Sequence, residues 1–356
     1  MSAPFHEPSA TLPDEAHQLW EVNAAWWQEW FTEGADPEYR EQIVPLLREL
    51  LIEAAPATVL DIGCGEGQLS RVSAGLAGVR LVVGVDPTRA QLEAALRRQP
   101  PTSARSRTSV AAVGARAGDA DASDAAAAAA AAAQGAVAGA RAGTEPAAPA
   151  TNAHAAAAAA AAADGSGADG PHPGELPAGA APVEGPEQAG PGPVMYARAT
   201  ATALPFPDGS FDAAFACLVF EHIEDVAAAL TEAGRALVPG GTFVLFMNHP
   251  LLQAPGSGWV DDDILGEQYW RIGPYLAENH GVEEVDKNIW IPFIHRPLSV
   301  YVNGLVRAGL YVTRMLEPPP PEGFLQKAAE YRRADAFPRL MVLVAKKLPN
   351  VPGPRA

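Results

Sequence analysis

The chain has 356 residues, of which 48% are hydrophobic, and a formal net charge of −17. The 25 basic residues are scattered and outnumbered by 42 acidic ones, which excludes the clustered positive surface that tracks nucleic-acid phosphates. No apolar run reaches the roughly 18 to 20 residues of a membrane span, and the first residues lack a basic start followed by an apolar core, so we expect a cytoplasmic protein without nucleic-acid or membrane partners.

The first predicted element is a helix rich in aromatic residues. Spacings of three and four place most of these side chains on one helical face. This face forms either a lid over an apolar ligand or the core of an N-terminal cap. The residues are Trp20, Trp26, Trp27, Trp30 and Phe31.

The next segment, 59–67, reads Val-Leu-Asp-Ile-Gly-Cys-Gly-Glu-Gly. The apolar run predicts a buried strand that ends near Asp61, with a helix beginning at about Gln68. Alternating glycines allow positive φ angles and let a ligand approach the backbone closely. We therefore predict a ligand-holding loop at 63–67.

A second apolar run, 80–85, predicts a strand that ends in Asp86. Asp86 lies about 20 residues after Gly67, the offset at which dinucleotide-type folds place the acid that binds ribose. The loop is Gly-x-Gly-x-Gly, whereas a nicotinamide site would carry Gly-x-Gly-x-x-Gly. The pattern indicates a nucleoside ligand, and the alternative for Asp86 is a helix N-cap for the following Pro87-Thr88 turn, before the helix predicted over 89–98.

Residues 100–193 contain no Phe, Trp, Tyr, Ile or Met, and Leu176 is their only leucine. Such a composition cannot build a core. We predict a disordered, low-complexity insertion in a surface connection, with a partner-binding tether as the alternative.

Cys64 and Cys217 are the only two cysteines. This count disfavours a disulfide scaffold, and we expect no metal site. Both are interpreted as small packing residues, with a reactive thiol as the alternative for Cys64.

Three ordered blocks follow the insertion. They read Leu-Pro-Phe-Pro-Asp-Gly-Ser-Phe-Asp-Ala-Ala-Phe at 204–215, Phe-Glu-His-Ile-Glu-Asp at 220–225 and Arg-Ala-Leu-Val-Pro-Gly-Gly at 235–241. Strands at 195 and in 211–218, 242–247, 310–315 and 340–345 alternate with helices at 226–237 and 298–308, which predicts a parallel sheet with helices on both faces.

With the glycine loop, these blocks resemble the class I S-adenosylmethionine-dependent methyltransferases, particularly the branch of ubiquinone/menaquinone-type and small-molecule enzymes. The resemblance implies an α/β, Rossmann-like seven-stranded sheet whose last strand is antiparallel, with S-adenosylmethionine as cofactor. It implies methyl transfer to a small-molecule acceptor. The aromatic residues of the N-terminal helix suggest that this acceptor is aromatic or apolar.

The predicted layout has seven parts. These are an aromatic-rich helical cap (1–56), the first half of the cofactor domain (57–99), the insertion (100–193), the second half (194–248), a substrate-side region (249–296), a C-terminal helix and hairpin of the same domain (297–347) and a disordered tail (348–356).

The resemblance also implies the cofactor site. The loop and Asp86 would surround the methionine part and the ribose, and Thr200 stands where the family usually has an acid that contacts adenine, so Ala201 backbone groups or apolar stacking would replace it. The predicted cofactor residues are Asp61, Gly63, Cys64, Gly65, Gly67, Asp86, Pro87, Thr200, Ala201, Leu204 and Cys217.

Methyl transfer chiefly requires alignment and exclusion of water, with acid-base help if the nucleophile carries a proton. His222 and His249 are the candidate bases, each with a positioning or packing role as the alternative. The predicted substrate side comprises Trp27, Trp30, His249, Tyr269, Trp270 and His295.

Two other functions stay open on the sequence. One is a nicotinamide-dependent oxidoreductase, which the glycine spacing disfavours. The other is a non-catalytic nucleoside-binding or interaction module, which the uncharged Thr200 modestly favours. The identity of the acceptor, the methylated atom and the oligomeric state are not specified by these motifs.

Overall fold

A computed structural model of the chain describes residues 16–31, 36–99, 192–327 and 333–349. The predicted insertion, apart from its last two residues, and most of the predicted C-terminal tail lie outside these ranges. The two halves of the predicted cofactor domain nevertheless meet in one sheet, because strands from 57–99 pair directly with strands from 194–248.

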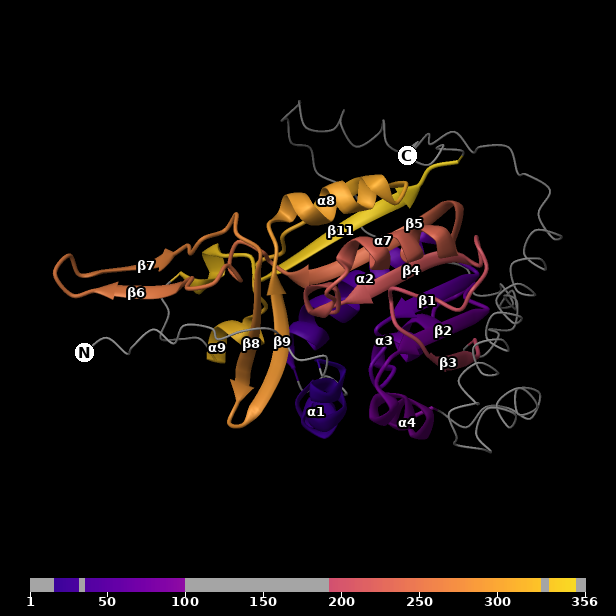
Figure 1. Cartoon of the computed structure of the whole chain (residues 1–356), viewed down its shortest axis with the longest axis horizontal. Helices are drawn as coiled ribbons and strands as arrows, with labels where there is room; N and C mark the ends of the chain where they lie inside the picture. Colours follow the sequence, from indigo (N-terminus) through magenta and orange to yellow (C-terminus); the bar gives the residue numbers. More distant parts are fainter. Residues whose placement is uncertain (1–15, 32–35, 100–191, 328–332, 350–356) are drawn as a thin grey trace, which may run out of the picture.

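Seven strands form the central sheet, in the order β10-β11-β5-β4-β1-β2-β3 (Figure 1). β11 pairs antiparallel with both β10 and β5, whereas β1 to β5 pair parallel, which confirms the predicted reversal of the last strand. The strands are β1 (Thr58–Ile62), β2 (Leu81–Asp86), β3 (Val194–Arg198), β4 (Phe211–Cys217), β5 (Leu237–Asn248), β10 (Leu310–Leu316) and β11 (Leu340–Lys347).

Helices cover both faces because successive side chains of a strand point to opposite sides. Leu60 and Ile62 pack with α7 and α8, whereas Val59 packs with α2 and α3 on the other face. The helices are α2 (Val44–Ala54), α3 (Gln68–Ala74), α4 (Arg89–Arg97), α7 (Val226–Ala236), α8 (Leu298–Arg307) and α9 (Glu322–Lys327), with a π-helical turn, η2 (Tyr39–Ile43), before α2 and short 3₁₀ turns η3 (Phe220–His222) and η4 (Ala334–Ala336).

The region after β5 carries few regular signals in the sequence, but the structure shows regular strands there. It holds two antiparallel hairpins, β6 (Gly258–Asp262) with β7 (Glu267–Arg271), and β8 (Asn279–Asp286) with β9 (Ile289–His295). Figure 1 shows β6 and β7 extending away from the sheet, while β8 and β9 lie beside α1. β6 and β7 mix polar and apolar residues and bury neither face fully, so they show no clean alternation, whereas β9 is mostly buried and is interrupted by Pro292.

The N-terminal helix α1 (Ala16–Phe31) bridges α4 and β9. The two oxygens of the Glu21 carboxylate accept the amides of Arg89 and Ala90 at 2.9 and 3.0 Å, so a side chain of α1 caps α4. On the other side, Asn23 Nδ2 donates to the Trp290 carbonyl at 2.7 Å. These bonds fix the height of α1 above the strand ends.

The described residues on either side of 100–191 lie close together. Gln99 Nε2 donates to the Val194 carbonyl at 2.9 Å, which joins the last turn after α4 to the start of β3. No helix in the described ranges is long and apolar enough to cross a lipid bilayer.

Gly234 tests the contact between α7 and α8. A Cβ at this position would lie 2.5 Å from the Ala308 carbonyl oxygen. Alanine favours a helix over glycine by about 1 kcal/mol, but overpacking against backbone costs about 1–3 kcal/mol, so we expect Gly234→Ala to lower the free energy of unfolding in urea denaturation. Gly75→Ala is the control, because its Cβ would meet only ordinary contacts of 3.5 Å and more. Equal stability of the two variants would contradict this account of the packing.

Candidate active site

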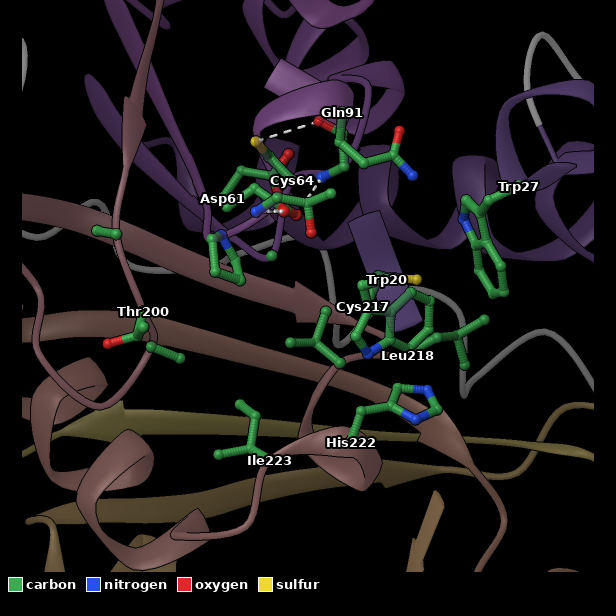
Figure 2. A pocket seen from close by; sticks show the side chains of 18 of the residues that line it. Trp20, Trp27, Asp61, Cys64, Gln91, Thr200, Cys217, Leu218, His222 and Ile223 are labelled. Atoms are coloured by element: carbon green, nitrogen blue, oxygen red, sulfur yellow. Dashed lines mark hydrogen bonds between the residues drawn. The ribbon is translucent and has the colours of Figure 1, made fainter. Parts of the chain in front are cut away.

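A cavity of about 600 Å³ opens at the carboxyl ends of β1, β2 and β4, beneath α1 (Figure 2). This is where open α/β sheets bind ligands, and the volume lies within the roughly 300–1,000 Å³ of small-molecule sites. It brings together most of the predicted cofactor residues and one predicted base. Those that line it are Asp61, Gly63, Cys64, Gly65, Asp86, Pro87, Thr200, Ala201, Cys217 and His222.

The glycines of the loop have different roles. All three have positive φ, but a Cβ at Gly63 would lie 2.4 Å from Val219 Cγ2, and one at Gly67 would lie 2.0 Å from the Tyr196 hydroxyl. A Cβ at Gly65 would meet no atom within 4 Å. Gly63 and Gly67 therefore satisfy the packing of the protein itself, whereas Gly65 leaves an open face beside the cavity.

Asp86 anchors this open loop. Its Oδ2 accepts the Gly65 amide at 2.9 Å and its Oδ1 accepts the Thr88 amide at 2.8 Å. The Thr88 bond also caps the Pro87–Thr88 turn before α4, as the capping alternative predicted, while Glu21 binds the first amides of α4 itself. Burial raises the pKa of the Asp86 carboxyl, although both amide bonds oppose the shift.

Asp61 is buried at the end of β1 and accepts a 2.5 Å hydrogen bond from the Ser70 hydroxyl of α3. Burial raises its pKa to about 7, and the nearby Asp86 adds to the shift. The cavity wall thus carries two carboxyls close together. Such a pair favours a positively charged ligand group, which would restore the ionised form of Asp61.

The two cysteines are buried and not joined to each other. Burial raises the pKa of the Cys64 and Cys217 thiols well above the usual value, so neither is a thiolate near neutral pH. This favours packing over the reactive-thiol alternative for Cys64. A Cβ at Gly84 would lie 2.9 Å from Cys64 Sγ, which shows how closely this thiol fits against β2.

The segment after β3 supplies the wall opposite the loop. Thr200 lies there, as its alignment implies, and its hydroxyl is 3.2 Å from that of Thr202. Leu204 lies in the core under this wall, and its amide donates to Glu232 at 2.7 Å. Leu204 and Gly67 are thus the two predicted cofactor residues outside the cavity lining.

His222 lies on η3, directly after β4, and lines the cavity. Its ring makes edge contacts with Trp20 and Phe293 at centroid distances of 4.8 and 5.8 Å. Its Nδ1 lies 2.6 Å from the Pro292 carbonyl oxygen of β9. Burial lowers the pKa of the imidazole to about 4, so the ring is neutral near pH 7.

The other predicted histidines lie outside the cavity lining. His249 uses both nitrogens, since Nδ1 accepts the Leu251 amide at 3.2 Å and Nε2 pairs with Glu317 Oε1 at 2.7 Å. His295 Nε2 pairs with the Tyr275 carbonyl at 2.8 Å. Both are buried in the base of the hairpin region, where these bonds hold loops together.

The aromatic residues divide in the same way. Trp20 and Trp27 of α1 line the cavity and contact each other edge to face at 5.4 Å. Trp270 packs instead against Trp259 and Phe337 at the base of the β6–β7 hairpin, and Tyr269 is exposed there. The side chain of Trp30 lies outside the described part of the structure.

Several lining residues were not predicted. Leu218 has a positive φ of 55°, a conformation uncommon for such a residue, and this turn brings Val219 against Gly63. Trp20 carried a usable signal in its position on the aromatic face. The others are Tyr39, Glu66, Gln68, Leu69, Thr88, Gln91, Ala199, Thr202, Leu218, Val219, Ile223, Glu224 and Asp225.

Comparison with known proteins agrees with this geometry. Residues 178–245 match the family model of a methyltransferase domain. An S-adenosylmethionine-dependent methyltransferase from Mesorhizobium loti superposes with a TM-score of 0.52 at 22% identity, covering 85% of this chain and 96% of that one. A related structure from Listeria monocytogenes gives 0.51 at 18% identity, covering 86% and 97%. The chain therefore has the class I S-adenosylmethionine-dependent methyltransferase fold, which confirms the resemblance drawn from its motifs.

Two curated relatives match shorter stretches. The chain is 46% identical over 52 residues to a demethylmenaquinone methyltransferase of Thermus thermophilus, which is 15% of this chain and 24% of that protein. It is 37% identical over 86 residues to a ubiquinone/menaquinone biosynthesis C-methyltransferase of Methylobacterium nodulans, which is 24% and 32%. The matches thus span about a quarter to a third of the length of these relatives.

The loop glycines predict a contrast in stability. We expect Gly63→Ala to be strongly destabilising, because its Cβ meets Val219 in addition to the cost of positive φ, about 1–2 kcal/mol. Gly65→Ala bears only the cost of φ and should fold, with a small decrease in thermal midpoint measured by circular dichroism. Equal losses in the two variants would show that backbone conformation alone decides both positions.

Proposed function

We propose that the protein transfers the methyl group of S-adenosylmethionine to a small-molecule acceptor that is aromatic or apolar. The observation that carries this proposal is the open face of Gly65 between two buried carboxyls, Asp61 and Asp86, in one cavity with Trp20 and Trp27. The cofactor of this class of enzymes is a cation with a ribose. The buried carboxyls suit the positive charge and the ribose of this cofactor, and the tryptophans suit an aromatic or apolar acceptor.

The residues fit this cofactor residue by residue. Asp86 would bind the ribose hydroxyls with lone pairs that its two amide bonds leave available. Asp61 would face the ammonium group of the methionine part, which offsets the cost of burying the carboxylate. The open side of Gly65 admits the ligand against the backbone. When bound, the cofactor supplies an electrophilic methyl group on a sulfonium.

Thr200 and Ala201 would border the adenine, with Pro87 on the side of β2. The wall there is uncharged, so recognition of the base would rest on hydrogen bonds of hydroxyl and backbone groups and on apolar contact. Trp20, Trp27 and Ile223 would form the acceptor side and exclude water. The chain itself contributes alignment, which is the main demand of an in-line methyl transfer.

The setting of the reaction follows from the charge and the layout. With a formal charge of −17, we propose a small-molecule acceptor in the cytoplasm rather than a nucleic acid. The seven-part layout, with 57–99 and 194–248 as the cofactor domain, stays part of this proposal. The described part of 249–296 would then support the acceptor side from behind, through the contacts of β9 with His222.

The first experiment is calorimetric titration with S-adenosylmethionine. We expect saturable binding by the wild type and at least a tenfold loss in Asp86→Asn, which puts a donor in place of one acceptor oxygen and removes the charge, and in Asp86→Ala, which removes both acceptors. Asp263→Asn, the same change at an exposed turn, should bind like the wild type. A folded wild type that does not bind would overturn the proposed function, and binding without turnover on any acceptor would favour a non-catalytic nucleoside-binding module.

The pKa of Asp61 predicts a pH dependence of binding. A carboxyl with a pKa of about 7 is mostly protonated at pH 5.5 and half ionised at pH 7. The cationic cofactor needs the ionised form, so its dissociation constant should rise about tenfold from pH 7 to pH 5.5. Asp61→Asn should bind more weakly and with little dependence on pH. A steep dependence that persists in this variant would assign the titration to another group.

A further inference from the structure

His222 differs from the other histidines of this region in what its second nitrogen faces. His249 binds protein groups through both nitrogens, and the second nitrogen of His295, Nδ1, is buried without a hydrogen-bond partner outside the cavity lining. His222 instead uses Nδ1 for its protein contact and contributes the rest of its ring to the cavity wall, beside Trp20 and Ile223 (Figure 2).

The Pro292 contact fixes the tautomer of His222. A carbonyl oxygen only accepts hydrogen bonds, so the nitrogen 2.6 Å from it must carry the proton. Because the enclosed ring is neutral near pH 7, Nε2 then has a lone pair and no proton. A ligand group that pairs with Nε2 must therefore be a donor, such as a hydroxyl.

The charge of the cavity narrows the ligand further. Among the described residues that line it there is no lysine or arginine. Five carboxyl residues line it, namely Asp61, Glu66, Asp86, Glu224 and Asp225, and Arg71 and Arg98 pair with Glu66 alone among them. A carboxylate or phosphate on the acceptor would be buried without a positive partner and near negative groups, which is costly. A neutral acceptor meets neither penalty.

The shape of the wall favours a planar compound. Trp20 and Trp27 stand at an interplanar angle of 77°, and the ring of His222 makes an edge contact with Trp20 at 70°. Flat rings offer large contact area to a flat ligand at little cost in side-chain entropy. His222 Nε2, which accepts a hydrogen bond, belongs to this aromatic wall.

We propose that the acceptor is a neutral, planar phenol or enol whose hydroxyl donates to His222 Nε2, and that the methyl group is transferred to this oxygen. This inference rests on the proposed function. His222 would thus be a catalytic residue that holds the hydroxyl oxygen in line with the methyl group and sulfur of the cofactor.

The step balances in atoms and charge. A lone pair of the hydroxyl oxygen forms a bond to the methyl carbon, and the carbon–sulfur bond breaks with its electrons on sulfur, giving a neutral thioether. The hydroxyl proton passes to Nε2, and the Pro292 carbonyl stabilises the resulting imidazolium through its bond to Nδ1–H. A weakly basic imidazole suits this step, because the oxygen becomes strongly acidic only as the new bond forms.

The test uses the full chain saturated with S-adenosylhomocysteine and three probes of one shape. These are 2-naphthol, 2-methoxynaphthalene and 2-naphthoate. We expect calorimetry to give about tenfold tighter binding of the naphthol than of the methoxy compound, one good hydrogen bond, and the weakest binding for the naphthoate. Equal binding of the first two, or a preference for the naphthoate, would overturn the proposal.

His222→Asn provides the matched variant, since its amide can keep the bond to the Pro292 carbonyl but has no atom at the position of Nε2. The naphthol preference should fall to within about twofold, while S-adenosylhomocysteine binds as in the wild type. A purely structural role would instead weaken all probes equally. If this variant does not fold, the comparison of probes in the wild type still decides the proposal.

The product gives a separate reading. With S-adenosylmethionine, 2-naphthol should form 2-methoxynaphthalene, and general-base loss in His222→Asn should slow this about 10²-fold or more. A methyl group on ring carbon, or no methylation despite bound cofactor, would overturn hydroxyl transfer while leaving the cofactor proposal intact. Failure of the wild type to bind S-adenosylhomocysteine would overturn the cofactor proposal itself.

Discussion

The site depends on one carbonyl group, that of Val85. It accepts the amides of both Gly63 and Cys64, at 2.8 and 2.9 Å, and so ties the end of β1 to the end of β2. The next residue, Asp86, returns a bond to the Gly65 amide. The backbone of Val85 and the side chain of Asp86 thus hold the loop from the same short stretch of β2. The distance between Asp61 and Asp86 follows from the pairing of β1 with β2 rather than from the loop itself.

Next to this loop, the aromatic wall of the cavity is built from elements that are remote in sequence. α1 is held at the strand ends by Glu21 and Gln28, which bind α4, and by Asn23, which binds β9. β9 in turn orients His222 through Pro292. The helical cap and the second hairpin therefore share control of one imidazole, and this explains how the enclosure of the cavity and the chemistry of its wall are linked.

The fold was largely predictable, because buried strands and amphipathic helices leave regular patterns. β2 and β10, for example, were predicted to within one residue at each end. The wall was not, because its signals are weak: a proline interrupts the apolar run of β9, and the turn at Leu218 uses a conformation that residue type does not indicate. Sequence position alone also does not separate His249 from His222, because what distinguishes them is the partners that the fold gives their nitrogens.

The junction between Gln99 and Val194 has a wider consequence. Since the two residues are joined by a hydrogen bond of 2.9 Å, a residue just after the end of α4 lies beside the start of the edge strand β3. The register of β3 with β2 is therefore set without reference to the number of residues between them. Evolution can lengthen or shorten the sequence between these two residues with little effect on the loop 63–67 and Asp86. A protein engineer can use the same point to insert a foreign domain.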